Sequence, residues 1–502
     1  MNMKLLVIGF DGATFDLIKP LSEKRMLPHI SRVMAQGVSA PLISVIPPVS
    51  APAWTSLVTG KNPGKHNIYG FQDKNGRVVN STFRKSKALW NLLDEHGKRS
   101  ITINIPMTSP PEKINGIMKS GILTPHERGF SGRFQIDRES LMEKEKALPK
   151  MFHWEINLTE KALEILKKEK WDLFFCVYHL SDFVPTIYWN YMDETHPQYI
   201  PHDALSTAVE DAYKVLDDIL GRYLSCIDSH TCVVVVSDHG MGPSKKVFNI
   251  NEWLRREGFL DIRTLTFRKV LSPEKVTGFI SRHAIIKRLI LLLPDSLQKR
   301  AYRMVFSKSK DVFSRVRERS YAYAFSHAHF ASIWLLKKDE ATLNEIEKRI
   351  RNLKDPGTGE PIITRVYRKD QLFHGPWEEN APDLMVEAVP HYSIRSQRIG
   401  TLFSEPLQSG DHRMNGIFIA QGPIVKNGNL EEHSIFDVCP TLLTILGLPV
   451  PSDMDGKVME IFKKEVSIQA AEESQREFHQ QVYTEEEEKT VKERLSALGY
   501  FD

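Results

Sequence analysis

Three segments of the chain place metal-binding residue types at the ends of predicted strands. Asp11 follows the apolar run Lys4–Gly9, and Asp238 and His239 follow four consecutive valines. His412 precedes another apolar run. Carboxylates and imidazoles are ligands that divalent cations such as zinc accept. Each residue also has an ordinary alternative, since an aspartate after a strand is often a helix cap and a lone histidine is often a surface residue.

A fourth segment places a serine directly before a predicted helix. Ser50 precedes the helix that we expect from Ala51 to Thr59, with Pro52 in its first turn and Gly60 at its end. Proline is favoured at the start of a helix, and the amides and dipole there can hold an anion beside the hydroxyl. Ser50 could therefore act on an anion bound at the helix start. The alternative is that Ser50 only caps the helix.

Taken together and in this order, the four segments resemble the alkaline phosphatase superfamily, in its type I phosphodiesterase and nucleotide pyrophosphatase branch. Residues 104–108, 115–118, 437–441 and 451–456 also match that branch, and the resemblance covers roughly residues 3–250 and 320–460. It implies an α/β fold with an alkaline-phosphatase-like, mostly parallel sheet and helices on both faces. It also implies a metal-dependent phosphoester hydrolase.

The resemblance further implies a site with two divalent ions, most readily Zn²⁺. The first ion would be bound by four residues: Asp11, Ser50, Asp238 and His239. The second would be bound by Asp182, by His412 and by a histidine four residues after the aspartate. This chain has Thr186 at that last position.

Thr186 is the main departure from the family pattern. A threonine hydroxyl stays protonated near neutral pH and binds zinc far less tightly than imidazole. We therefore expect a loosely held second ion, a harder ion such as Mn²⁺, or another side chain in place of the histidine. His179 and His196 are the candidates by position in the sequence. A one-metal enzyme and a catalytically impaired phosphoester-binding protein remain the alternatives.

The resemblance implies a covalent phosphoserine intermediate at Ser50. Ala53 and Trp54 follow the nucleophile, where apolar groups favour phosphodiesters over monoesters. Trp54 also stands where sulfatases carry an arginine, which argues against a sulfatase. A phosphomonoesterase or a phosphotransferase of the same superfamily is the alternative. The expected partner is a small-molecule phosphoester, which could be a nucleotide diester, a pyrophosphate, a phospholipid head group or a phosphonate ester.

Strand and helix patterns alternate along the chain. Strands are expected at Lys4–Gly9, Ser100–Ile105, Leu173–Tyr178, Thr231–Ser237 and Gly416–Ala420. Further helices are expected at Pro28–Gln36, Lys87–Glu95, Thr159–Lys170, Ala204–Leu224 and Ile435–Leu446. This alternation predicts a mostly parallel sheet covered on both faces, with chemistry beyond the carboxyl ends of its strands.

The sequence divides into four predicted parts. The core comprises residues 1–258 and 321–462, interrupted by a basic helical cap at 259–320 and followed by a charged helical tail at 463–502. From Asp261 to Ser320 there are 15 lysines and arginines against 5 acidic residues. The cap could guide anionic substrates or weakly contact an anionic membrane surface, or it could be a solvated basic insert. In the tail, Leu495, Leu498 and Tyr500 could dock the helix end.

The overall composition is that of an ordinary globular protein. The net charge of +4 over 502 residues does not indicate a nucleic-acid partner. The four cysteines lack paired metal-ligand spacing, so we expect reduced thiols. The start of the chain does not have the pattern of a signal peptide, and we expect a cytoplasmic location. The sequence makes no prediction about oligomeric state.

Overall fold

The computed structural model describes residues 3–121, 124, 143–261, 320–396, 400–472 and 483–497. The predicted basic cap at 259–320, with its proposed contact to anionic surfaces, lies almost entirely outside the described residues. Leu498 and Tyr500 of the predicted tail lie outside them as well. Within the described ranges, no helix is long and apolar enough to cross a membrane.

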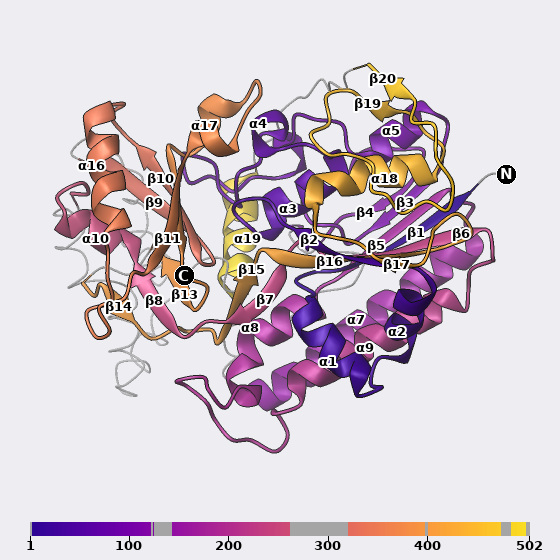
Figure 1. The fold of residues 1–502 in the computed structure, drawn as a ribbon, viewed down its shortest axis with the longest axis horizontal. Helices are drawn as coiled ribbons and strands as arrows, with labels where there is room; N and C mark the ends of the chain where they lie inside the picture. The colour runs from indigo at the N-terminus through magenta and orange to yellow at the C-terminus, as the bar shows by residue number, and fades with distance from the viewer. Residues whose placement is uncertain are drawn as a thin grey trace, which may run out of the picture.

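A nine-stranded sheet forms the centre of the larger part of the molecule (Figure 1). Its strands are β1 (Lys4–Phe10), β2 (Val38–Ile43), β3 (Ser100–Ile103), β4 (Gly116–Lys119), β5 (Leu173–Tyr178), β6 (Thr231–Val236), β16 (Asn415–Gln421), β17 (Gly428–Asn429) and β18 (His433–Ser434). They run in the order β17-β2-β16-β6-β1-β5-β3-β4, with β18 beside β2. The pairs around β1, β3 and β5 are parallel, whereas β16 is antiparallel to β2 and β6. The prediction of a mostly parallel sheet is confirmed.

The central strands are apolar at nearly every position because both faces of the sheet are covered. In β1, Leu5 and Val7 pack into one core, and Leu6 and Ile8 pack into the other. The first core lies under α3 (Ser50–Thr59), α5 (Leu89–Glu95) and α18 (Val438–Ile445). The second lies under α1 (Phe15–Glu23), α2 (Pro28–Gln36), α7 (Lys144–Lys168), α8 (Leu180–Met192) and α9 (Ala208–Leu224). Figure 1 shows these two helical layers above and below the sheet.

Smaller sheets form a second body beside the large sheet, at the left of Figure 1. One has the order β11-β12-β10-β9, with β9 (Ala322–His327), β10 (Phe330–Leu335), β11 (Ile363–Arg368) and β12 (Leu384–Ala388). Another has the order β13-β8-β14, with β8 (Lys246–Asn249), β13 (Tyr392–Arg395) and β14 (Phe403–Ser404). They share an apolar core with α10 (Ile250–Arg256) and α16 (Glu340–Arg351).

A two-stranded ribbon and several further elements complete the described part of the fold. The strands β7 (Gly240–Pro243) and β15 (Gly410–Arg413) form an antiparallel ribbon. The remaining elements are α4 (Pro63–His66), η1 (Ser81–Phe83), α17 (Lys369–Leu372), η2 (Glu378–Asn380), η3 (Ile435–Asp437), β19 (Val450–Pro451), β20 (Ala470–Ala471) and α19 (Glu485–Ala497). Among the described residues of the predicted second part of the core, 321–462, only β16, β17 and β18 join the large sheet. The predicted division into core, cap and tail stays a prediction.

Most predicted elements begin and end within a few residues of their expected bounds. The bounds of α2, Pro28–Gln36, are the same as those predicted. The helix expected from Thr159 begins much earlier, at Lys144, because buried Leu148, Met151 and Trp154 continue its apolar face. The predicted tail contains α19, whose Val491 and Leu495 are fully buried. The tail helix is therefore docked on the molecule at Leu495, as expected.

Candidate active site

The sheet topology brings the predicted site residues to one edge. Because β1, β5 and β6 are adjacent and parallel, their carboxyl ends meet there. Asp11 follows β1, His179 follows β5, and Asp238 stands two residues after β6. The segment after β2 leads to Ser50, and His412 precedes the start of the antiparallel β16. Residues far apart in the sequence therefore converge on one place.

Asp11 is fully buried, and two aromatic rings hold one of its carboxylate oxygens. Trp54 Nε1 donates a hydrogen bond to Asp11 Oδ2 at 3.0 Å, and His179 Nδ1 lies 3.0 Å from the same oxygen. The Trp54 ring packs over Gly9, where a Cβ atom would come within 2.6 Å of it. With Oδ2 fixed, Asp11 Oδ1 lies 3.4 Å from Nε2 of His239.

Asp238 and His239 complete the group around Asp11. Asp238 Oδ1 accepts a hydrogen bond from the Gly12 amide at 3.4 Å, and Asp238 Oδ2 lies 3.4 Å from His239 Nε2. His239 Nδ1 lies 3.1 Å from its neighbouring carbonyl at Gly240, so we assign the ring proton to Nδ1. This tautomer directs the Nε2 lone pair toward the two carboxylates, as expected of a metal ligand.

His412 and Asp182 form a second group beside the first. His412 Nδ1 lies 2.9 Å from the Pro48 carbonyl, and Nε2 lies 3.2 Å from Asp182 Oδ1. The rings of His412 and His239 stack, with their centroids 3.8 Å apart. Ligand atoms of Asp182, His239 and His412 lie within 4.8 Å of one another, as do those of Asp11, Asp238 and His239. His239 therefore lies between the two groups.

The chemistry of this cluster fits divalent cations. Asp11 Oδ1, Asp238 Oδ2 and His239 Nε2 are buried and have no hydrogen-bond partner among the described residues. An unsatisfied buried polar group costs about 1–3 kcal/mol, and more when it is charged. These atoms also point toward one another. A cation between them would satisfy all three.

Burial and neighbouring charges shift the pKa values of the cluster. Burial raises the pKa of Asp238 well above its ordinary value, and the nearby carboxylates of Asp11 and Asp182 raise it further. Burial, together with the neighbouring His412 imidazole, lowers the pKa of His239 to about 3. His239 therefore stays neutral, in the form that binds metals. The crowded carboxylates repel one another unless a cation joins them.

Ser50 begins α3 at the same edge, with 3% of its surface exposed. Val49, not Ser50, occupies the cap position of the helix, so the alternative that Ser50 serves as the cap is wrong. The carbonyl of Pro48, two residues before Ser50, is hydrogen-bonded to His412. The indole of Trp54, one helical turn after Ser50, donates to Asp11. These two bonds tie the helix start to both ligand groups. Of the next residues, Pro52 has no N–H, and the Ala53 amide donates to the Val49 carbonyl at 3.1 Å.

Comparison with known proteins identifies the family. The sequence profile described as type I phosphodiesterase / nucleotide pyrophosphatase matches residues 5–416. The chain belongs to this family. It is therefore a phosphoric ester hydrolase by family, in a group of metal-dependent enzymes, and the predicted resemblance is confirmed. No curated protein matches the chain in sequence.

Several solved structures share the fold of this chain. Murine ectonucleotide pyrophosphatase / phosphodiesterase 5 has 16% identity and a TM-score of 0.53, with 89% of this chain and 95% of that one covered. Its inactive threonine-to-alanine variant in complex with AMP has a TM-score of 0.52 at the same identity and coverage. Phosphonoacetate hydrolase from Sinorhizobium meliloti 1021, in complex with phosphonoformate, has 13% identity, a TM-score of 0.53, and coverage of 87% and 94%. These likenesses show the fold.

Thr186 is the residue that the sequence resemblance sets against the third ligand of the second ion. It stands one turn after Asp182 on α8, so both residues share a helix face. A Cβ atom on Gly410 would come within 3.2 Å of the Thr186 Cα, next to the strand that carries His412. His179, one of the two candidates to replace the family histidine, binds Asp11. His196 bonds the Ser244 carbonyl and the Gln198 amide, so it joins two loops.

The roles of two residues in the site were not predicted from the sequence. The indole of Trp54 is fully buried against the sheet and bonds Asp11, so it does not line the space for a phosphate oxygen. Its spacing of four residues from Ser50 was the available signal. Asp411 is also buried, and it accepts a hydrogen bond from the His412 backbone amide at 2.9 Å. It accepts a second hydrogen bond from the Ser393 hydroxyl. These two bonds hold the strand that carries His412 in place. The position of Asp411 beside His412 was the only sign of this role.

Proposed function

We propose that the protein hydrolyses small phosphodiesters or pyrophosphates at this cluster, with Ser50 as the nucleophile and with bound divalent cations. One observation carries the proposal. Three buried, converging ligand atoms of Asp11, Asp238 and His239 lack partners among the described residues, beside the helix start that carries Ser50. The site residues proposed for the first ion are Asp11, Ser50, Asp238 and His239. Those proposed for the second are Asp182 and His412.

In this mechanism, the Ser50 hydroxyl attacks phosphorus and expels the leaving alcohol or phosphate, which gives a phosphoseryl intermediate. Water then cleaves the phosphoseryl bond and restores the hydroxyl. The Ala51 amide and the α3 dipole stabilise negative charge on the phosphoryl oxygens. Bound cations supply the positive charge that lowers the pKa of the hydroxyl and offsets charge on the departing oxygen. Trp54 and His179 keep Asp11 oriented throughout.

The first ion is proposed to be Zn²⁺, because its group combines an imidazole with two carboxylates. The second group is poorer in nitrogen, since Thr186 replaces the family histidine, and it could take Mn²⁺. Its ligand atoms are those of Asp182 and His412, with His239 close to both.

The proposed substrates are small molecules. The fold neighbours are solved with AMP and with phosphonoformate, each of which carries a phosphoryl or phosphonyl group. A phosphonate ester and a nucleotide are therefore useful probes, beside simple aryl esters. An aryl phosphomonoester measures the alternative activity.

The test is turnover of bis(4-nitrophenyl) phosphate and 4-nitrophenyl phosphate by wild type and Ser50→Ala, each stripped and then loaded with Zn²⁺ or Mn²⁺. We expect faster turnover of the diester by wild type, with loss of at least about a thousandfold in the variant, as expected for removal of a nucleophile that acts with its partners. Removal of one small hydroxyl from the helix start should leave the fold intact. Near-normal hydrolysis by Ser50→Ala would exclude this nucleophile. A faster monoester reaction would assign the alternative.

A further inference from the structure

The tail helix α19 packs into an apolar cluster that also contains the two neighbours of Ser50. Val491 and Leu495 of α19 stand one turn apart, so they share a face of the helix, and both are fully buried. We call the cluster to which they belong the flanking cluster. Its other buried members are Val49, Ala51, Ile68, Phe71, Val78, Val79, Phe83 and Met107. The last described helix of the chain therefore packs beside the start of α3.

The stability of α19 depends on this docking. The helix spans 13 residues, and an isolated helix of that length is marginal in water. A capping box begins it, in which the Thr484 amide donates to Glu487 Oε2 at 2.9 Å and the Glu487 amide donates to Thr484 Oγ1 at 3.3 Å. Among its described side chains, Val491 and Leu495 alone are buried. These two residues therefore connect the helix to the rest of the protein.

Polar contacts on both sides of Val491 fix the helix against its neighbours. Glu488 Oε1 accepts a hydrogen bond from the Val78 amide at 3.4 Å and pairs with Lys492 at 2.8 Å. Nearer the other end of the helix, Arg494 Nη1 donates to the Thr124 carbonyl. Both contacts to the neighbouring segments reach main-chain groups. They keep the apolar face of α19 turned toward the flanking cluster.

Two different apolar clusters hold the start and the body of α3. Trp54 and Leu57 pack into the core under the large sheet. Val49 and Ala51, on either side of Ser50, belong to the flanking cluster instead. The placement of the Ser50 hydroxyl therefore depends on the cluster that α19 completes.

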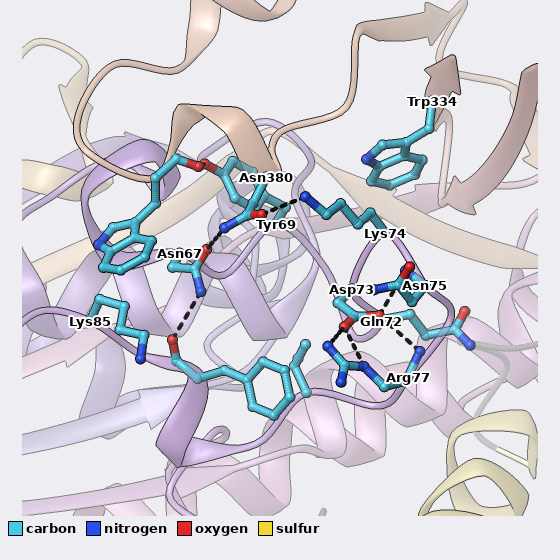
Figure 2. Close-up of a pocket in the computed structure, with 13 residues that line it drawn as sticks. Asn67, Tyr69, Gln72, Asp73, Lys74, Asn75, Arg77, Lys85, Trp334 and Asn380 are labelled. Carbon is cyan, nitrogen blue, oxygen red and sulfur yellow. Dashed lines mark hydrogen bonds and ion pairs between the residues drawn. The ribbon is translucent and has the colours of Figure 1, made fainter. Parts of the chain in front are cut away.

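The segment 67–85, which contributes several members of the flanking cluster, has its own anchor on the small-sheet body. It lines a pocket together with Trp334 of β10 and Asn380 of η2 (Figure 2). Asn67 Nδ2 donates to the Phe83 carbonyl at 3.3 Å, and Asn380 Nδ2 donates to Asn67 Oδ1 at 3.0 Å. Because these bonds do not involve α19, loosening of the tail helix should disturb the start of α3 before it disturbs this segment.

We propose that Val491 and Leu495 are positioning residues for Ser50. By completing the flanking cluster, the docked tail helix holds Val49 and Ala51, and with them the Ser50 hydroxyl, where it can attack a phosphoryl group. Misplacement of a reacting group by about 1 Å can lower a rate about a hundredfold. The inference rests on the proposed function, since it concerns the reactivity of Ser50. It gives the tail helix a role in the reaction although none of its described residues belongs to the metal cluster.

Hydrogen exchange at the start of α3 measures this positioning without reference to activity. The Ala53 amide donates to the Val49 carbonyl at 3.1 Å, and this bond closes the first turn of the helix. In the full-length chain, Leu495→Ala opens a gap in the flanking cluster, and the milder Val491→Thr places a hydroxyl there. Each should speed exchange at least about tenfold in peptides that cover residues 47–59. Peptides that cover β1 and β6 should exchange as in wild type.

Turnover of bis(4-nitrophenyl) phosphate by the metal-loaded variants measures the consequence for the reaction. Both substitutions leave the metal ligands in place, so the metal content and KM should stay close to wild type. Because the nucleophile is misplaced, kcat should fall at least about tenfold in both variants. Leu495→Met keeps the apolar volume and should retain both the kcat and the exchange rates of wild type.

Two matched controls separate positioning from a general loss of stability. Ile346→Ala shortens a fully buried side chain of α16 in the core of the small-sheet body, outside the flanking cluster. It should change neither kcat nor exchange at residues 47–59. Glu493→Ala removes an exposed side chain of α19 itself and should behave as wild type.

The outcomes distinguish this inference from the proposed function. Unchanged exchange at residues 47–59 in both α19 variants, or unchanged kcat in both while Ser50→Ala is inactive, would overturn this inference alone. A fall in kcat that Ile346→Ala shares would show a general loss of stability and overturn it as well. Hydrolysis that survives Ser50→Ala would overturn the proposed function and, with it, this inference.

Discussion

Two ring N–H groups on one carboxylate oxygen decide where the other oxygen points. At Asp11, Trp54 and His179 occupy Oδ2, so Oδ1 faces His239 and the proposed cation. Such outer partners orient metal ligands and are often as important as the ligands themselves. The indole therefore acts as a positioning residue for Asp11, in addition to filling the core above Gly9.

Trp54→Phe should keep most of the packing and remove only the N–H bond to Asp11. We expect a fall of about 10–100-fold in metal affinity and in kcat/KM, the usual effect of losing an outer-shell partner. Trp90→Phe is the matched control, because Trp90 Nε1 also donates to a carboxylate, Glu112 Oε2 at 3.3 Å, and Glu112 is not part of the metal cluster. It should leave metal affinity unchanged. Equal loss in both variants would show a general effect on packing.

In the proposed site, Thr186 would make the second group poorer in nitrogen than the family pattern. Thr186→His should supply a third strong ligand beside Asp182 and His412 and tighten Zn²⁺ binding there by at least about tenfold. Titration of stripped protein with Zn²⁺ and Mn²⁺ measures this change, and Thr186→Gln controls for size. Unchanged affinity in the histidine variant would mean that this position does not face the cation.

At the scale of elements, the ends of β1, β5 and β6 and the start of α3 assemble the site. The helix α7 contributes a buried carboxyl group next to the site. Glu155 Oε1 accepts a hydrogen bond from the His179 backbone amide at 2.5 Å. Burial raises the pKa of Glu155 to about 7, against an ordinary value of 4.5. Its second oxygen, Oε2, has no hydrogen-bond partner among the described residues.

The raised pKa of Glu155 makes folding stability depend on pH. The folded state favours the protonated carboxyl, so this contribution is fully present below the unfolded pKa near 4.5 and is lost as the pH rises to about 7. The loss amounts to about 3 kcal/mol across that window. Denaturant unfolding of chelator-treated wild type and Glu155→Gln at pH 4.5 and pH 7.5 measures it. The variant should lose less stability than wild type between the two values, and parallel losses would contradict the assignment.

At the scale of the whole molecule, the sequence predicted the large sheet better than the way in which distant segments pair around it. Apolar runs such as Thr231–Val236 stand out because both faces of the sheet are covered. The antiparallel direction of β16 and the small-sheet body depend on pairing between distant segments, which local pattern does not encode. For the same reason, the sequence did not predict that Trp54 and His179 bind Asp11. These contacts form only because β1, β5 and α3 lie together in the fold.

The central claim is that the cluster at the strand edge holds divalent cations beside Ser50. Elemental analysis of metal in protein purified without chelator tests it most directly, with Asp238→Asn analysed in parallel. The account predicts about two equivalents of divalent metal per wild-type chain, as in two-metal phosphoryl-transfer sites, and a loss of at least about one equivalent in the variant. A wild-type chain without stoichiometric metal, or a variant that keeps the full complement, would contradict it.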